Sequence, residues 1–124
     1  MHIQQEPPDL HSIQAYSDSE IKINSIIYSQ SLIVSREQII LDWKVHSIID
    51  LNEILLESIL KMQPEVVIIG HCEPGILAPL SILTLLSQHR IGMECMSIGA
   101  ASRTYNVLLS EERAVVAGFI LPRV

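Results

Sequence analysis

The most constraining stretch of this chain is the continuous apolar run at residues 66–69, VVII, which is followed directly by Gly70. Unbroken runs of this length are typical of strands covered on both faces, and therefore of central parallel strands. Residues 80–89 then have the length and composition of a helix, and residues 92–96 those of a second strand. A strand, a helix and a strand within ~30 residues form a right-handed crossover between parallel strands. The sequence therefore predicts an α/β protein.

A second unit of the same kind follows in the carboxyl-terminal third. We expect a turn at residues 97–99, a helix over residues 100–109, a short connector at 110–113 and a last strand over 114–121. The earlier helix, residues 80–89, is apolar on nearly every side, which indicates either deep burial or a surface for a partner.

The first third of the chain favours β structure. Residues 21–23 and 26–28 read as two strands joined by a turn at Asn24 and Ser25, and two further short apolar runs lie at residues 31–35 and 38–41. Their β-branched residues suit a pleated surface, so we predict a β-hairpin or meander. Trp43, the only tryptophan, is expected to fill space between this β region and the first helix.

A helix is predicted from Asp50 to the residues before Pro64. The Asp50 carboxylate is placed to accept the backbone N–H of Glu53, and Pro64 is placed to end the helix. Apolar residues recur at helical spacing along one face, at Leu51, Ile54, Leu55, Ile59 and Met62. Glu57 and Lys61 are spaced to form an ion pair on another face.

Length and composition bound the domain organisation. A chain of 124 residues that is 48% hydrophobic is sufficient for one domain with its own core. Residues 1–9 are polar and contain a proline pair, so we expect a polar tail there and a single α/β domain over residues 10–124.

Charge and cysteine content exclude several functional classes. The net charge is −6, and the eight lysines and arginines are scattered singly, so we expect no nucleic-acid binding and no docking on an anionic membrane. No apolar run reaches the ~20 residues of a transmembrane helix, and no signal peptide is evident. The two cysteines form neither a disulfide framework nor a paired metal motif. We therefore expect a cytoplasmic protein without a cofactor or a structural metal.

Any binding site is expected at the carboxyl ends of the parallel strands. The loops at residues 70–75 and 97–101 leave two such ends, and they would line one crevice if their strands are neighbours. The start of the last helix would point free N–H groups into that crevice, and Arg103 would add a donor for a carboxylate or phosphate. The candidate ligand-binding residues are Gly70, His71, Cys72, Gly99, Ala100, Ala101, Arg103, Thr104, Tyr105 and Asn106.

The same residues also have structural interpretations. The small residues around Gly99 permit close packing of the last helix on the sheet, and Arg103 has possible partners in the acidic residues Glu94, Glu111 and Glu112. Tyr105 and Asn106 are suited to anchoring that helix to neighbouring loops. His71 and Cys72 are adjacent in sequence, so their side chains need not meet, and no catalytic residue is assigned.

Several segments resemble an uncharacterised domain family whose best-known eukaryotic relative is the third assembly factor of mitochondrial respiratory complex I. The resemblance rests on residues 64–70 (PEVVIIG), 92–96 and 100–111 (AASRTYNVLLSE), with Arg113 and Val115 following. Residues 31–35 and Trp43 also match, so that the similarity covers about residues 10–121. Two departures fall on the predicted crevice, because the family often has Gly-Thr-Gly at residues 70–72 and Asp-Thr at residues 97–98.

The resemblance implies a three-layer α/β fold with a central mixed, largely parallel sheet and an additional β element. It implies no enzymatic activity and a role exerted through protein partners. Our first hypothesis is therefore a non-enzymatic protein-interaction or assembly domain, with a homo-oligomer as one form of partnership. The alternative is a small-anion-binding protein or an enzyme that uses the loops at residues 70–75 and 97–104.

Overall fold

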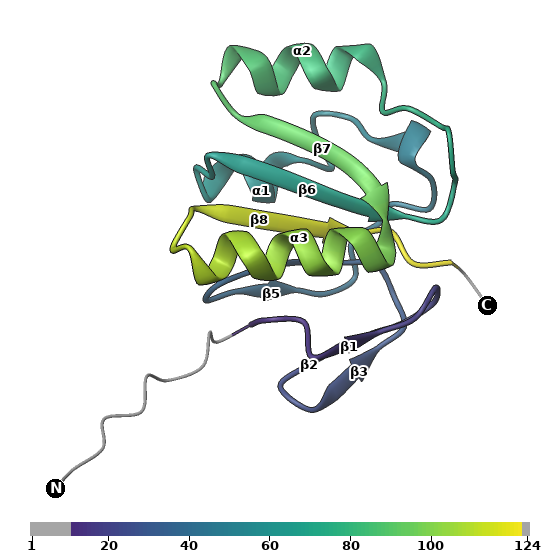
Figure 1. The fold of residues 1–124 in the computed structure, drawn as a ribbon. Coiled ribbons are helices and arrows are strands. Elements are labelled where there is room, and N and C mark those ends of the chain that lie inside the picture. Colours follow the sequence, from purple (N-terminus) through teal and green to yellow (C-terminus); the bar gives the residue numbers. More distant parts are fainter. Residues whose placement is uncertain (1–10, 123–124) are drawn as a thin grey trace, which may run out of the picture.

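The computed structural model describes residues 11–122, which form one five-stranded sheet, one three-stranded sheet and the helices that cover them (Figure 1). The five-stranded sheet has the strand order β5-β4-β8-β6-β7. Its strands are β4 (Leu32–Ser35), β5 (Ile39–Ile40), β6 (Val66–His71), β7 (Gly92–Ser97) and β8 (Val115–Phe119). β6 is parallel to β7 and β8, whereas β4 is antiparallel to both of its neighbours. The predicted mixed sheet is confirmed.

β6 is a central strand, as its unbroken apolar sequence predicts. It pairs with β7 on one side and with β8 on the other. Val67 and Ile69 pack into one hydrophobic core, and Ile68 packs into a second core on the opposite face. Both faces of the strand are therefore buried, and this is why no polar residue alternates along it.

The two cores separate three layers. One face of the sheet is covered by α3 (Ile98–Ser110) and by the small antiparallel sheet of β1 (Ala15–Tyr16), β2 (Ile21–Ile23) and β3 (Ile26–Tyr28). The other face is covered by the 3₁₀ turn η1 (Ile48–Asp50), α1 (Glu57–Lys61) and α2 (Leu80–Gln88). This is the three-layer α/β arrangement that the family resemblance implies. The predicted polar tail, residues 1–9, lies outside the described residues.

The predicted hairpin is confirmed although its turn contains no glycine. Asn24 and Ser25 both adopt positive φ angles, 51° and 66°, and the flanking residues Ile23 and Ile26 pair directly. Two successive residues with positive φ are the backbone requirement of a tight hairpin turn, and asparagine tolerates this region better than most residues.

The predicted helix beginning at Asp50 is wrong over its first half. Asp50 is the last residue of η1, where Ser47 rather than Asp50 is the capping residue, and the only α-helical stretch is Glu57–Lys61. The Asn52 side chain accepts the N–H of Leu55 at 2.9 Å, which holds the intervening chain in turns. Ile54, expected on the buried face, is 80% exposed.

The other helical predictions differ from the structure only at the ends. α2 ends one residue earlier than predicted. α3 starts two residues earlier, because the Ser97 hydroxyl caps it by accepting the N–H of Ala100 at 3.2 Å. The predicted ion pair between Lys61 and Glu57 is present at 3.2 Å.

Trp43 fills the space between the β region and the first helix, as predicted. Its indole N–H donates to the carbonyl of Leu55 at 2.9 Å, and its ring lies against the backbone of Gly118 in β8. A Cβ atom at Gly118 would come within 2.6 Å of that ring. The glycine therefore allows a large aromatic ring to approach the middle of the sheet closely.

Candidate functional site

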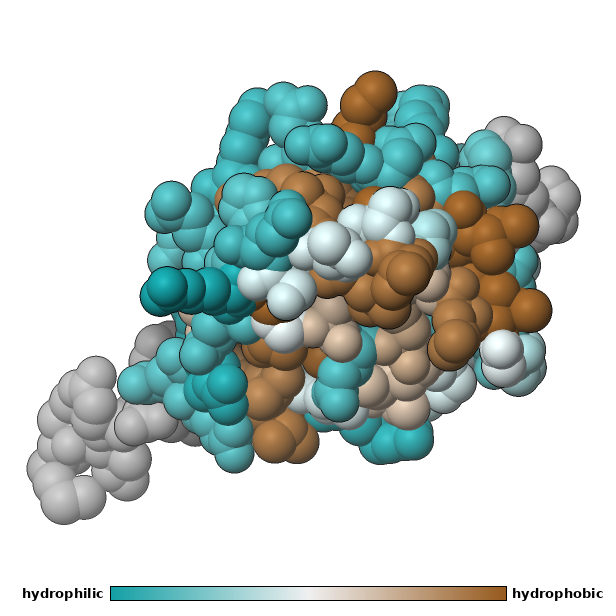
Figure 2. All heavy atoms as spheres, turned by 90° about the horizontal axis from the view of Figure 1, so that it is seen from above, coloured by the Kyte–Doolittle hydropathy of each residue, from teal (hydrophilic) through white to brown (hydrophobic). Residues whose placement is uncertain are grey.

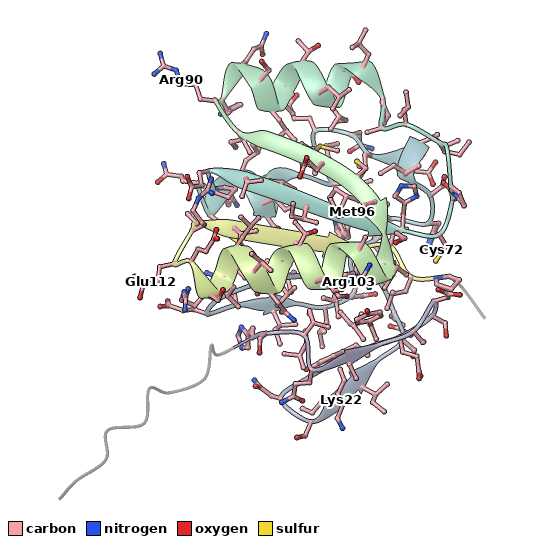
Figure 3. The ribbon with its side chains drawn as sticks, viewed as in Figure 1. Lys22, Cys72, Arg90, Met96, Arg103 and Glu112 are labelled. Atoms are coloured by element: carbon pink, nitrogen blue, oxygen red, sulfur yellow. The ribbon has the colours of Figure 1, made fainter. Side chains whose placement is uncertain are left out.

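The two loops at the carboxyl ends of β6 and β7 line one pocket, as expected for neighbouring parallel strands. The strands run in register to their ends, where His71 pairs with Ser97. The pocket beyond them has a volume of about 440 Å³. Figure 3 shows Cys72 and Met96 toward this end of the sheet, on the chain leaving β6 and on β7. We call this cavity the strand-end pocket.

The walls of the strand-end pocket are mostly apolar. Ile76 and Leu77 come from the segment between β6 and α2, Met96 from β7 and Ile98 from the start of α3. An acidic residue, Asp18 in the turn between β1 and β2, also lines it. The small sheet thus supplies one wall of a pocket that the main sheet begins.

Hydrogen bonds fix the loop that follows β6. The Cys72 thiol donates to the carbonyl of Asp18 at 3.1 Å, which joins the loop to the small sheet. The Glu73 carboxylate accepts from the Ser47 hydroxyl at 2.8 Å and from the N–H of Ile48 at 3.2 Å. The loop is therefore tied to both sides of the molecule, so that the pocket is formed before anything binds.

His71 is buried at the base of the strand-end pocket with only 7% of its surface exposed. Its Nδ1 accepts the N–H of Glu73 at 3.1 Å, so the proton of the neutral ring is on Nε2. Burial lowers the pKa of His71 below 6.5, and the nearby Glu73 carboxylate only partly opposes this effect. The ring is consequently neutral at pH 7 and presents an N–H donor.

The pKa of His71 predicts how stability depends on pH. The unfolded chain binds a proton near pH 6.5, whereas the folded chain does so only at a lower pH, so the contribution of His71 is complete above pH 6.5 and is lost as the pH falls. We expect His71→Asn, whose side-chain oxygen can still accept from Glu73, to lose less stability than wild type between pH 7.5 and pH 5. Urea unfolding at both pH values measures this. An unchanged pH dependence would contradict it.

Neither thiol at this site is activated as a nucleophile. Burial raises the pKa of Cys72, and the carboxylates of Asp18 and Glu73 raise it further. Burial alone raises the pKa of Cys95 to about 11. Both groups stay protonated at neutral pH, and a thiol without a thiolate fraction is a weak nucleophile and a poor metal ligand. Within residues 11–122, no three histidine, cysteine or acidic side chains cluster as metal ligands do.

Arg103 does not line the strand-end pocket. Its Nη1 donates to the hydroxyl of Tyr16 in β1, and its guanidinium lies 5.7 Å from the centre of that ring. The suggested pairing of Arg103 with Glu94, Glu111 or Glu112 is wrong, because its partner is aromatic and comes from the small sheet. The cation–π contact joins α3 to β1 across their exposed edge.

The other predicted site residues either allow α3 to pack closely on its neighbours or anchor α3 to the segment before β1. Gly70 and Ala101 lie where β6 and α3 approach closely, and Gly99 lies against the ring of Tyr16. Tyr105 is fully buried and donates to the carbonyl of His11 at 3.0 Å. The predicted residues that do not line the pocket are Gly70, Gly99, Ala100, Ala101, Arg103, Thr104, Tyr105 and Asn106.

Asn106 confirms the anchoring interpretation most clearly. Its side-chain oxygen accepts the N–H of Ile13 at 2.8 Å, and its side-chain amide donates to the carbonyl of the same residue at 2.9 Å. An amide that pairs with both backbone groups of one residue acts like a neighbouring strand. Asn106 and Tyr105 thus hold residues 11–13 against α3.

Sequence reasoning missed five residues of the pocket: Asp18, Ile76, Leu77, Cys95 and Met96. Ile76 and Leu77 could have been identified from the sequence, because large aliphatic side chains in a loop are commonly buried or functional. Asp18 gave no signal, because it lies in the turn of a different sheet.

Known proteins share this architecture. A family model described as "Protein of unknown function (DUF498/DUF598)" matches residues 13–120. A solved structure from Xanthomonas campestris is 32% identical, with a TM-score of 0.83 and coverage of 98% of this chain and 92% of that one. An outer membrane protein from Bartonella henselae is 29% identical, with a TM-score of 0.78 and coverage of 94% and 98%.

A further relative, from Francisella tularensis, is named "13 kDa major membrane protein" and is 32% identical over 89 residues, which is 71% of this chain and 72% of the relative. Among the helices of residues 11–122, none has the length and hydropathy needed to cross a membrane. The match over residues 13–120 places this chain in the protein family of unknown function DUF498/DUF598.

Proposed function

We propose that this chain is a non-enzymatic protein-interaction domain that works in the cytoplasm as an assembly or adaptor protein. The observation that carries this proposal is an exposed group of aliphatic side chains before and within α2. These residues are Ile76, Leu77, Leu80 and Leu83, with 45%, 79%, 76% and 40% of their surfaces exposed. We call this group the apolar ridge.

The apolar ridge lies on a supported part of the fold. Ile82 and Leu86 are buried in the core from another side of α2, so the helix cannot rotate to hide Leu80 and Leu83. Figure 2 looks down on the molecule from the α2 side, and brown apolar side chains gather on that face. Contiguous exposed apolar surface on a soluble protein is typical of a binding surface. This supports the second of the two interpretations of the all-round apolar helix, a surface for a partner.

The family resemblance supports the same role. The third assembly factor of respiratory complex I, a member of the family that the sequence resembles, acts through protein partners. A second copy of this chain could also cover the apolar ridge. The lining of the strand-end pocket favours this role over anion binding, because no lysine or arginine of the described residues lines the pocket and Asp18 does. The scattered basic residues and the net charge of −6 favour a protein partner over nucleic acid or an anionic membrane.

Removal of the apolar ridge should abolish partner capture without unfolding the chain. We expect the double variant Leu77→Ser and Leu80→Ser to lose at least tenfold in recovery of stoichiometric partners from native cytoplasm, because both side chains are more than three-quarters exposed and contribute little to the core. Quantitative affinity capture with mass spectrometry measures the loss. Light scattering over a range of concentrations reports any loss of self-association.

A matched control removes the same amount of apolar surface elsewhere. Ile26→Ser with Ile27→Ser changes two residues of β3 that are 55% and 60% exposed, on the small sheet away from α2. This variant should keep its partners. Equal recovery with wild type, ridge variant and control variant would rule out the apolar ridge as the interaction surface.

A further inference from the structure

The strand-end pocket is continuous with the apolar ridge, because Ile76 and Leu77 belong to both. At about 440 Å³ it falls in the range of ~300–1,000 Å³ that binding pockets occupy. Aliphatic residues and two sulfur-containing residues, Cys95 and Met96, form most of its inner wall. A pocket of this size and lining suits one aliphatic side chain or a short aliphatic ligand.

His71 adds a requirement for a hydrogen-bond acceptor. Its Nδ1 is used by Glu73, and its Nε2 has no hydrogen-bond partner within residues 11–122. Because no fully buried polar side-chain atom of these residues lacks a partner, Nε2 must be reached by water from the pocket. A ligand that displaces this water must supply an acceptor oxygen in its place, and a peptide carbonyl does so without adding charge.

Charge restricts the occupant further. Among residues 11–122, Asp18 is the only charged residue that lines the strand-end pocket, and both Asp18 and Glu73 act electrostatically on the Cys72 thiol. A fatty acid or a phosphate would bring a second negative charge into this field, whereas a lysine or arginine beside the mouth would be attracted to it. Arg103, the cation that the sequence predicted for this crevice, is held on Tyr16 instead.

From these three features we infer that the strand-end pocket receives one aliphatic side chain from an extended partner segment that carries lysine or arginine on either side of it. The side chain fills the apolar wall, the carbonyl of the same residue accepts from His71 Nε2, and a flanking cation faces Asp18. This inference rests on the proposed interaction function. It adds the chemistry of the partner segment to that function.

The test is selection from a random phage-displayed peptide library against the full chain, followed by fluorescence anisotropy with a labelled synthetic peptide of the consensus. We expect the recovered peptides to share one leucine, isoleucine or methionine with lysine or arginine nearby. Cys72→Arg, which introduces a large cation at the exposed edge of the pocket, should weaken binding at least tenfold. Ser87→Arg, which adds the same charge at an exposed position near the end of α2, should change it less than twofold.

The contribution of the Asp18 charge to peptide binding is tested with a separate pair of variants. Asp18→Asn should weaken binding about threefold or more at low salt, with a smaller effect at 0.5 M NaCl, because salt screens exposed charges. Asp50→Asn, an exposed carboxylate on η1, is the matched control and should change affinity less than twofold. Sodium decanoate, which offers an aliphatic chain with a carboxylate, should show no saturable binding.

Three results would overturn the inference: no enriched peptide, a consensus without basic residues, or affinity that Cys72→Arg leaves unchanged. Saturable decanoate binding that Cys72→Arg removes would assign the pocket to a lipid-like acid instead. If the apolar-ridge variant still loses its partners in any of these cases, the proposed interaction function stands and only the pocket assignment fails. If that variant keeps its partners, the interaction function itself fails.

Discussion

Replacement of Trp43 by alanine is expected to lower the free energy of unfolding by about 3–5 kcal/mol. The indole is 93% buried, since only 7% of its surface is exposed, and it covers Gly118 in the middle of the sheet. Its removal leaves a cavity in the core, and it leaves the carbonyl of Leu55 without its donor. Urea unfolding followed by far-UV circular dichroism measures the loss, because this substitution also removes the only tryptophan fluorophore.

The contact between Trp43 and Gly118 can be tested from its other side. Gly118→Ala alone should destabilise the fold by about 1–3 kcal/mol, because its Cβ would lie 2.6 Å from the ring. In the Trp43→Ala background the same change should cost much less, because the ring that it meets is gone. Additive effects of the two substitutions would show that they do not act through this contact.

Gly70→Val is expected to destabilise the fold by about 3 kcal/mol, because Gly70 lies where β6 and α3 approach closely. A Cβ atom there would lie 2.8 Å from the Cβ of Ala101 and 3.0 Å from the ring of Phe119. β6 and α3 would have to move apart, since both neighbours are fully buried. The midpoint of urea unfolding measures the effect.

Gly92 provides the control for that substitution. It lies in β7, the neighbouring strand, and a Cβ atom there meets nothing closer than 3.8 Å. Gly92→Ala should therefore change stability by less than about 1 kcal/mol. If Gly70→Val were tolerated equally well, the close approach of α3 to the sheet would not depend on this glycine.

The parts of the fold that were predictable are those whose cause is local or periodic. The apolar run of β6 predicts its central position, and the spacing from β6 to β7 predicts their parallel pairing. The helix predicted from Asp50 failed because two nearby polar side chains, Ser47 and Asn52, stabilise turns there. Ser47 is in turn held by Glu73, which is 26 residues away. A periodic apolar pattern carries no information about such distant partners.

The candidate site was predictable in position but not in composition. Parallel strands predict a pocket at their carboxyl ends, and His71 and Cys72 are found there. Asp18 reaches the pocket from a turn 54 residues away from Cys72, and Arg103 is drawn away from it by Tyr16, 87 residues distant. Both contacts depend on how the small sheet docks against the large one. That docking is set by packing between layers and leaves no pattern in either segment.

The place of β8 in the sheet has a consequence for protein synthesis. β8 lies between β4 and β6, yet it is translated after every other strand. Until residues 115–119 leave the ribosome, the amino-terminal strands and the β6–β7 pair have no neighbour in common, and each presents an open edge. The nascent chain therefore exposes these edges until β8 is available, and the main sheet assembles only when β8 is inserted between its two halves.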